Sequence, residues 1–299
     1  MSSHVNTRKY RLIEFFTPYA MLLPSALVFA VFVIFPVFFS LYMSFFNWRA
    51  VSSTREFIGI SNYAQLLTSS EFLHSVKVTF AYVAGIIPIG MGLGLVVALL
   101  LNRKMRGVTM YRVLYYLPVV TAWAAIGVVW RWIYQPSYGL LNVVLERLGL
   151  PIGYWLSEPE TAMPSLIAVG AWKVIGYNAV IFLAGLQNVP QELYEAAEID
   201  GAGGLRKFTR ITWPLLTPTT FFLLIVSVIN SFQNFSGVYV MTKGGPMEST
   251  RVIVYYLYQQ AFVFFNMGYA SAVAWILVLV VFVLTLLQMK FADNKVHYQ

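Results

Sequence analysis

Between residues 190 and 214 the chain carries a dense group of charged residues that changes sign across a glycine. The charged residues and that glycine are Glu192, Glu195, Glu198, Asp200, Gly201, Arg206, Lys207 and Arg210. Proline followed by acids is typical of a helix start, and glycine after a last polar residue is typical of a helix end. The pattern therefore predicts two short helices joined at Gly201, with Pro214 closing the second.

The first of these helices presents a small apolar face, made by Leu193, Ala196 and Ala197. Charge runs are commonly solvated faces, so a hairpin lying at a surface is one interpretation. A tight helical hairpin with a small-residue face also suits insertion into a groove on a partner protein. On the residues alone, both interpretations stay open.

Four short polar side chains recur at three- and four-residue steps inside an apolar segment, at Ser227, Asn230, Ser231 and Asn234. This spacing predicts that they share one helical face. Such groups can bond neighbouring helices, which contributes only about 0.6 kcal/mol per bond in a membrane. Hydroxyls and amides beside aromatic residues would also suit a sugar, because they offer hydrogen bonds next to flat apolar rings.

Lys173 is the one charge that lies far from the ends of the apolar segments. A lysine at mid-membrane costs at least about 2.5 kcal/mol unless it faces water or a partner group. It is interpreted either as a lysine satisfied by carbonyls or water at a subunit interface, or as a pathway residue that orients polar or anionic solutes.

What the sequence lacks excludes several kinds of chemistry. The chain has no cysteine and only three scattered histidines, so it offers no thiol catalysis and no metal cluster or nucleophile–base pair for a membrane enzyme. No Gly-x-x-x-x-Gly-Lys-Ser/Thr phosphate loop occurs, so any ATP must be hydrolysed by another chain. Acidic residues and histidines avoid the middle of the apolar segments, which argues against a proton-coupled secondary transporter. Sodium coupling and a channel stay open as alternatives.

The elements that must position these residues are membrane helices. Hydrophobic residues make up 59% of the 299 residues and charged residues only 11%, too few to cover the surface of a soluble protein. The sequence predicts an all-α polytopic membrane protein with a single integral domain over residues 1–299. Its six predicted spans are 15–45, 73–101, 108–134, 163–186, 217–241 and 269–290, the first kinked at Pro18, Pro24 or Pro36.

The basic residues predict the orientation of these spans. Twelve of the twenty fall at the termini and in the 2–3 and 4–5 loops: Arg8, Lys9, Arg11, Arg103, Lys104, Arg106, Arg112, Arg206, Lys207, Arg210, Lys290 and Lys295. By the positive-inside rule, both termini and these loops are cytoplasmic. The loop of residues 187–216 is then cytoplasmic, and residues 139–149 form a short helix on the outer membrane surface. Gly90-x-x-x-Gly94 predicts close helix packing.

The chain resembles a known family at several separate places. Glu195-Ala196-Ala197, then Asp200-Gly201-Ala202, is similar to the EAA loop of permease subunits in bacterial ATP-binding-cassette (ABC) importers. Residues 57–63, 138–142 and 155–156 resemble the outer loops of that family, and residues 242–246 resemble its Thr-x-Gly-Gly-Pro segment in the carbohydrate branch, the maltose-permease type.

The resemblance implies a role and a set of partners. It implies a type I importer permease that forms half of a pathway for a sugar or oligosaccharide, with Ser227, Asn230, Ser231, Asn234 and Lys173 along it. It also implies a second permease, two cytoplasmic ATPase subunits coupled through Glu195, Ala196, Ala197, Asp200, Gly201 and Ala202, and an extracytoplasmic solute-binding protein. The ATPases bind ATP and Mg²⁺, so the permease has no cofactor or catalytic residue of its own. The resemblance also implies a bacterial inner-membrane location, with membrane lipid as a partner and no binding of nucleic acid. The alternative solute is glycerol phosphate or another small polar molecule.

Overall fold

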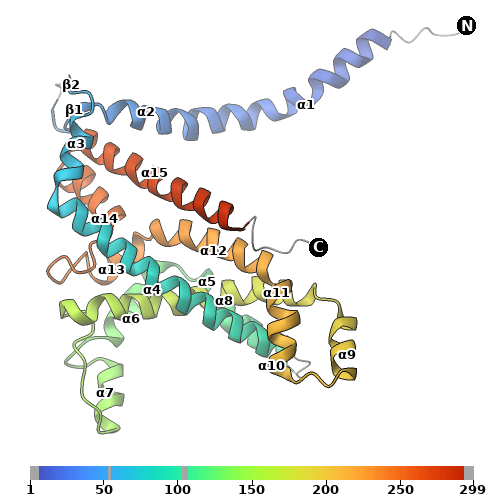
Figure 1. The fold of residues 1–299 in the computed structure, drawn as a ribbon. Coiled ribbons are helices and arrows are strands. Elements are labelled where there is room, and N and C mark those ends of the chain that lie inside the picture. The colour runs from blue at the N-terminus through green and yellow to red at the C-terminus, as the bar shows by residue number, and fades with distance from the viewer. Residues whose placement is uncertain (1–6, 53–54, 103–106, 293–299) are drawn as a thin grey trace, which may run out of the picture. The chain divides into compact units, whose positions relative to one another are not determined.

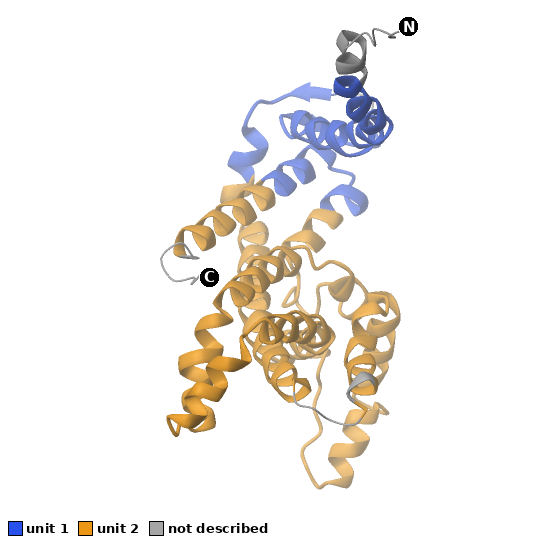
Figure 2. Cartoon of the chain, turned by 90° about the vertical axis from the view of Figure 1, so that its right-hand side faces the viewer, with its two compact units in different colours: residues 1–65, 260–275 blue, residues 66–259, 276–299 orange. Residues whose placement is uncertain are grey.

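The computed structural model describes residues 7–52, 55–102 and 107–292, and this part of the chain is almost wholly helical (Figure 1). The basic residues Arg103, Lys104, Arg106 and Lys295, which contribute to the predicted orientation, lie outside the described residues, as do His4 and His297. Tertiary contacts divide the chain into two units, residues 1–65 with 260–275 and residues 66–259 with 276–299 (Figure 2). The sequence predicts one integral domain over the same residues.

The first unit holds the most N-terminal apolar helix. The helix runs through α1 (Thr7–Phe29), a π-helical turn η1 (Ala30–Ile34) and α2 (Phe35–Met43), with Pro36 in the first turn of α2. Its segment Glu14–Met43 is long and apolar enough to cross a membrane, and none of its most apolar window is buried. A helix with no polar face and no burial is suited to lipid or to another chain.

A small hairpin follows this helix in the same unit. Strands β1 (Phe46–Trp48) and β2 (Arg55–Phe57) pair antiparallel, with Phe46 opposite Phe57, and α3 (Ser61–Thr68) comes next. Asn62 donates hydrogen bonds to the carbonyls of Ser44 and Phe46 at 2.8 and 3.1 Å, which fixes the end of the helix on the hairpin. These two short strands are the only β-strands among the described residues.

The second unit holds the remaining helices, apart from the shared ends of α3, η3 and α15. In chain order they are α4 (Ser70–Leu101), α5 (Val108–Val120), α6 (Trp123–Ile133), α7 (Leu140–Arg147), α8 (Pro159–Gln187), α9 (Gln191–Ile199), α10 (Gly204–Lys207), η2 (Phe208–Thr212), α11 (Trp213–Leu215), α12 (Thr217–Phe232), α13 (Ser236–Met241), α14 (Ile253–Tyr258), η3 (Gln259–Val263) and α15 (Met267–Ala292).

The described helices give four segments able to cross a membrane, or up to six if each of two bent pairs counts as one span. Four predicted spans correspond to single helices. The predicted span 108–134 is instead bent by 96° between Met110–Val120 and Trp123–Ile133. Thr121 and Ala122 are extended there, with ψ of 135° and 138°, so the helical hydrogen bonds stop and restart.

The second bent pair corrects the expected end of the hairpin helix. Pro214 does not close this helix, because the helix runs over Gly204–Leu215 and bends by 62° only before Thr217–Phe232. The π-helical turn η2 comes directly before α11, so Pro214 takes a first-turn position, where the missing N–H costs nothing.

The core of the second unit is the contact between α4 and α8, at the glycines that the sequence predicts for close packing. A Cβ at Gly90 would lie 2.7 Å from Val174 Cγ2, and one at Gly94 would lie 2.6 Å from Asn178 Cβ. Only glycine leaves room for α8 at these positions, so the predicted close packing is confirmed.

The predicted short helix over 139–149 is also present, as α7, with Gly149 at φ +68° after its end. The amide of Asn142 holds the loop around it. Its Nδ2 donates to the carbonyls of Pro136 and Gly153, and its Oδ1 accepts from Gly153 N and from Trp155 Nε1 at 2.8 Å.

Candidate functional site

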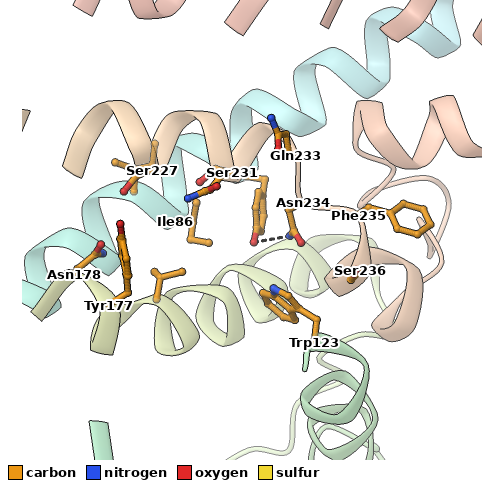
Figure 3. Close-up of a pocket in the computed structure, with 14 residues that line it drawn as sticks. Ile86, Trp123, Tyr177, Asn178, Ser227, Ser231, Gln233, Asn234, Phe235 and Ser236 are labelled. Carbon is orange, nitrogen blue, oxygen red and sulfur yellow. Dashed lines mark hydrogen bonds between the residues drawn. The ribbon is translucent and has the colours of Figure 1, made fainter. Parts of the chain in front are cut away.

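A cavity of about 370 Å³ lies among α4, α8, the start of α6 and the segment from α12 to α13 (Figure 3). It is lined by Tyr82, Ile86, Ile87, Trp123, Val174, Tyr177, Asn178, Ser227, Asn230, Ser231, Gln233, Asn234, Phe235 and Ser236. The side chains of Tyr177, Asn178 and Ser227 lie toward one end of it, and those of Trp123 and Asn234 toward the other (Figure 3).

The structure brings together the four polar residues that the sequence places along a pathway, but not on one helix. Ser227, Asn230 and Ser231 lie on α12, which ends at Phe232. Asn234 lies beyond that end, in the short break before α13, so the expectation of one continuous helical face is wrong for it. The break turns backbone and side chain at Asn234 toward the cavity, where Gln233 and Ser236 join it.

A hydrogen bond ties this break to α4. Asn234 Nδ2 donates to the hydroxyl of Tyr82 at 2.7 Å, drawn as the dashed line in Figure 3. Tyr82 is only 1% exposed, and a Cβ at Gly170 would lie 2.7 Å from its hydroxyl, so α8 also holds the ring in place. A buried hydroxyl in such a setting needs its partner, because an unsatisfied polar group is costly in a membrane.

Sequence reasoning missed four polar or aromatic lining residues that come from other helices: Tyr82, Trp123, Tyr177 and Asn178. A signal existed for two of them. Val174, Tyr177 and Asn178 follow the i, i+3, i+4 spacing of one helix face, with an amide inside an apolar span. Tyr82 and Trp123 carried no such signal, because aromatic residues are common throughout the chain.

The cavity can bind a polar, uncharged molecule. Among its described lining residues, the polar groups are amides, hydroxyls and an indole, and none is an ionised side chain. These groups donate and accept hydrogen bonds beside the aromatic rings of Trp123 and Tyr177.

Lys173 does not line this cavity. It is 8% exposed, and its ammonium donates to the carbonyls of Pro118, Val119 and Thr121 at 2.8, 3.3 and 2.8 Å. Of the two interpretations of Lys173, the structure matches the lysine satisfied by carbonyls.

The charged hairpin forms as the sequence predicts, and its turn is closed by hydrogen bonds. Gly201 has φ +72°, a left-handed conformation that favours glycine. Ala202 N–H donates to the Ala197 carbonyl at 2.8 Å, and Gly201 N–H donates to the Glu198 carbonyl at 3.0 Å. This pair of bonds is the Schellman motif, which satisfies the last carbonyls of a helix.

Side chains hold the two helices of the hairpin together at two further points. Lys207 Nζ lies 2.6 Å from Glu198 Oε1, and the hydroxyls of Tyr194 and Thr212 lie 2.9 Å apart. The hydrogen bond and charge of Lys207 lower the pKa of Glu198. The Glu198 side chain is 66% exposed, so the pair orients the hairpin more than it stabilises it.

The surface of the hairpin is open on the side of its turn. Glu195, Ala196, Asp200 and Gly201 are exposed, and Ala197 and Ala202 are partly exposed. Two large apolar side chains that the sequence analysis did not single out flank the turn: Ile199 is 88% exposed and Leu205 is 79% exposed. Exposed apolar side chains surrounded by charges are typical of a protein-binding surface.

No group of three or more His, Cys, Asp or Glu side chains in the described part of the chain could hold a metal ion. The candidate functional site therefore has two parts, a polar cavity and a charged hairpin. Leu216 joins the second helix of the hairpin to α12, which lines the cavity.

Comparison with known proteins gives one family and several close relatives. Residues 90–297 match the family described as binding-protein-dependent transport system inner membrane component. The sn-glycerol-3-phosphate transport system permease protein UgpA of Agrobacterium fabrum is 37% identical over 284 residues, covering 94% of this chain and 96% of that protein. The probable ABC transporter permease protein YesP of Bacillus subtilis is 36% identical over 286 residues, covering 94% of this chain and 92% of that protein.

Solved structures agree in fold. A chain of a bacterial ABC transporter involved in the import of the acidic polysaccharide alginate aligns with a TM-score of 0.84 at 25% identity, covering 96% of this chain and 99% of that one. A second structure of the alginate transporter, in complex with an alginate pentasaccharide-bound periplasmic protein, aligns with the same score and covers 98% of its chain.

Proposed function

The chain belongs to the family of binding-protein-dependent transport system inner membrane components, and on this premise we propose that it forms half of an ATP-driven import pathway for a neutral sugar or oligosaccharide. It is a multi-pass inner-membrane permease of an ABC importer for sugar-type solutes, and it is not itself an enzyme. Its resemblance to this family, at the EAA loop and the outer loops, is thereby confirmed.

The polar cavity carries the proposal for the pathway. Asn230, Ser231 and Asn234 present amides and a hydroxyl to a space bounded by aromatic rings, which suits a molecule with many hydroxyl groups and apolar ring faces. The 370 Å³ volume is within the range of small-molecule sites. A second permease would supply the other wall.

The uncharged lining of the cavity favours a neutral solute over an anionic one. Two relatives carry names that refer to anions, sn-glycerol 3-phosphate and alginate, and these names support glycerol phosphate or another small polar anion as the second candidate. An anion needs a cation or several converging donors. None of the described lining residues is charged, and the nearest buried cation, Lys173, spends its donors on backbone carbonyls.

The hairpin supports coupling to ATPase subunits. Residues Glu195 to Ala202 form the exposed end of the first helix and the turn, and Ile199 and Leu205 add apolar anchors on either side of Gly201. A short helix of this kind suits a groove on a partner. In the proposed assembly one of the two ATPase subunits binds here, on the cytoplasmic side together with both termini. The loop around α7 lies on the opposite side, with the solute-binding protein.

Uptake by the reconstituted complex tests the substrate. The permease, its partner permease, the ATPases and the binding protein are placed in proteoliposomes and given a panel of neutral sugars, sn-glycerol 3-phosphate and an acidic oligosaccharide. The proposal expects ATP-dependent uptake of a neutral sugar. Uptake of the anionic solutes alone would reject the neutral-sugar assignment and support the second candidate.

A further inference from the structure

Lys173 lies midway along α8, at the depth where an isolated charge is most costly in a membrane. Its ammonium contacts the place where the backbone of the neighbouring α5 stops being helical. Pro118 and Val119 belong to the last turn of α5, and Thr121 lies in the extended link to α6. Lys173 is therefore a cap placed on α5 from another helix.

The number of donors on the Lys173 ammonium equals the number of carbonyls that accept from it. An ammonium has three donors, and three carbonyls accept from it. Carbonyls left without a donor in the membrane would each cost several kcal/mol. A positive charge at the C-terminal end of α5 is also favoured by the helix dipole. Gly176, one turn further along α8, lets α5 approach, since a Cβ there would lie 2.0 Å from the Tyr115 carbonyl oxygen.

The same ammonium reaches the aromatic wall of the cavity. Trp123 is the first residue of α6 and follows the capped link directly. Its ring centroid lies 5.5 Å from Lys173 Nζ, which is cation–π distance. The ring also lies close to α13, where a Cβ at Gly237 would lie 3.2 Å from Trp123 Cζ3.

We propose that Lys173 is a positioning residue for the solute pathway: by capping α5 and holding the ring of Trp123, it fixes one wall of the polar cavity. The inference rests on the proposed function in one respect, that this cavity is where solute passes. Lys173 acts through Trp123 and does not contact the solute, because its donors are already used and it does not line the cavity.

The test combines a spectroscopic signal with transport. The complete importer is prepared with 5-fluorotryptophan, and the ¹⁹F resonances of Trp123 and Trp172 are assigned by their loss in Trp123→Phe and Trp172→Phe. Uptake per ATP hydrolysed is measured in proteoliposomes with maltose as the neutral probe and sn-glycerol 3-phosphate as the anionic probe. Trp172 is the matched control, because it neighbours Lys173 in sequence but does not line the polar cavity.

Lys173→Met is expected to move the Trp123 resonance, leave that of Trp172 in place, and lower uptake per ATP about fivefold for the transported probe. Lys173→Arg, which keeps the positive charge and the hydrogen-bond donors, is expected to retain both the Trp123 resonance and the uptake per ATP. Trp123→Leu should lower uptake to a similar extent, and the double variant Lys173→Met/Trp123→Leu should lower it no further.

Three outcomes would overturn the inference: an unmoved Trp123 resonance in Lys173→Met, multiplied losses in the double variant, or a loss confined to the anionic probe. If Lys173→Met fails to assemble, Lys173→Gln serves the same comparison, because it keeps amide donors without the charge. A different result would count against the proposed function alone. In that case Asn234→Leu would transport normally, while Lys173→Met would still move the Trp123 resonance.

Discussion

Asn234 and Tyr82 are 152 residues apart in the chain, and a hydrogen bond of 2.7 Å joins the side-chain amide of the first to the hydroxyl of the second. The bond fastens the break between α12 and α13 to α4, with both residues on the cavity wall. Asn234 and Tyr82 therefore hold the wall of the cavity together as well as lining it.

Loss of these amides is expected to reduce transport more than assembly. Asn230→Leu and Asn234→Leu change the volume little but remove hydrogen-bonding groups, so uptake should fall about fivefold or more. The measurement is uptake per assembled complex. Thr285→Val is the control, because the Thr285 hydroxyl bonds the Val281 carbonyl of its own helix. Normal uptake by both asparagine variants would make these amides packing groups.

Distortion of the hairpin turn is expected to uncouple the permease from its ATPases. Gly201→Val places a β-branched residue at φ +72°, which should break the Schellman bonds, and Ala197→Trp enlarges the small face. Both variants should insert and bind the second permease. Co-purification of the ATPase, or its solute-stimulated hydrolysis, should fall. Unchanged values in both assays would show that coupling occurs elsewhere.

The apolar side chains at the turn are expected to act as anchors for the ATPase. Ile199→Ser and Leu205→Ser each remove an exposed apolar side chain, and each should weaken ATPase association about tenfold. Titration of the detergent-purified permease pair with ATPase measures this affinity. Val51→Ser, at a residue 75% exposed in the first unit, should leave it unchanged. Equal affinity for all variants would contradict the anchor role.

The stability of the hairpin is expected to depend on the opposite charges of Glu198 and Lys207. Glu198→Lys should loosen the hairpin, and the swap Glu198→Lys with Lys207→Glu should restore it. Because the pKa of Glu198 is lowered, the pair is intact at neutral pH and is lost only as the pH falls through that lowered value. Amide hydrogen exchange of residues 198–207 follows both effects. A swap that exchanges as fast as the single variant would contradict the pairing.

The orientation is expected to place residue 201 in the cytoplasm and residues 55, 147 and 247 outside. The absence of cysteine makes single-cysteine variants at these positions direct probes with an impermeant maleimide. In intact cells, positions 55, 147 and 247 should label and position 201 should label only after permeabilisation. Labelling of 201 in intact cells would reverse the proposed topology.

Features that depend on local sequence were predictable. The apolar lengths indicated the long helices α4, α8 and α15. Gly90 and Gly94 indicated the close packing of α4, and Asp200-Gly201 indicated the turn. Each of these follows from residues within a few positions of one another.

Features that depend on distant residues were not predictable. Pro118 indicates a weak point in the span, but nothing nearby indicates a 96° bend with extended residues, because the carbonyls that the bend releases are satisfied by Lys173, more than fifty residues later. Tyr82 and Trp123 became cavity residues through contacts with Asn234 and Gly237. The end of α12 at Phe232 likewise moved Asn234 off the expected helix face.

The helical segment Gly204–Leu215, with its π-helical stretch Phe208–Thr212, connects the hairpin turn to the helix that lines the cavity. Its twelve residues are about 18 Å long, so a tilt of about 5° displaces its far end by about 1.5 Å. Leu216, which is completely buried, lies at the bend. Beyond it the same backbone continues as α12, which carries Ser227, Asn230 and Ser231. In the proposed coupling, a displacement imposed at the hairpin would therefore rotate the residues of α12 that face the cavity, in a direction set by the 62° bend.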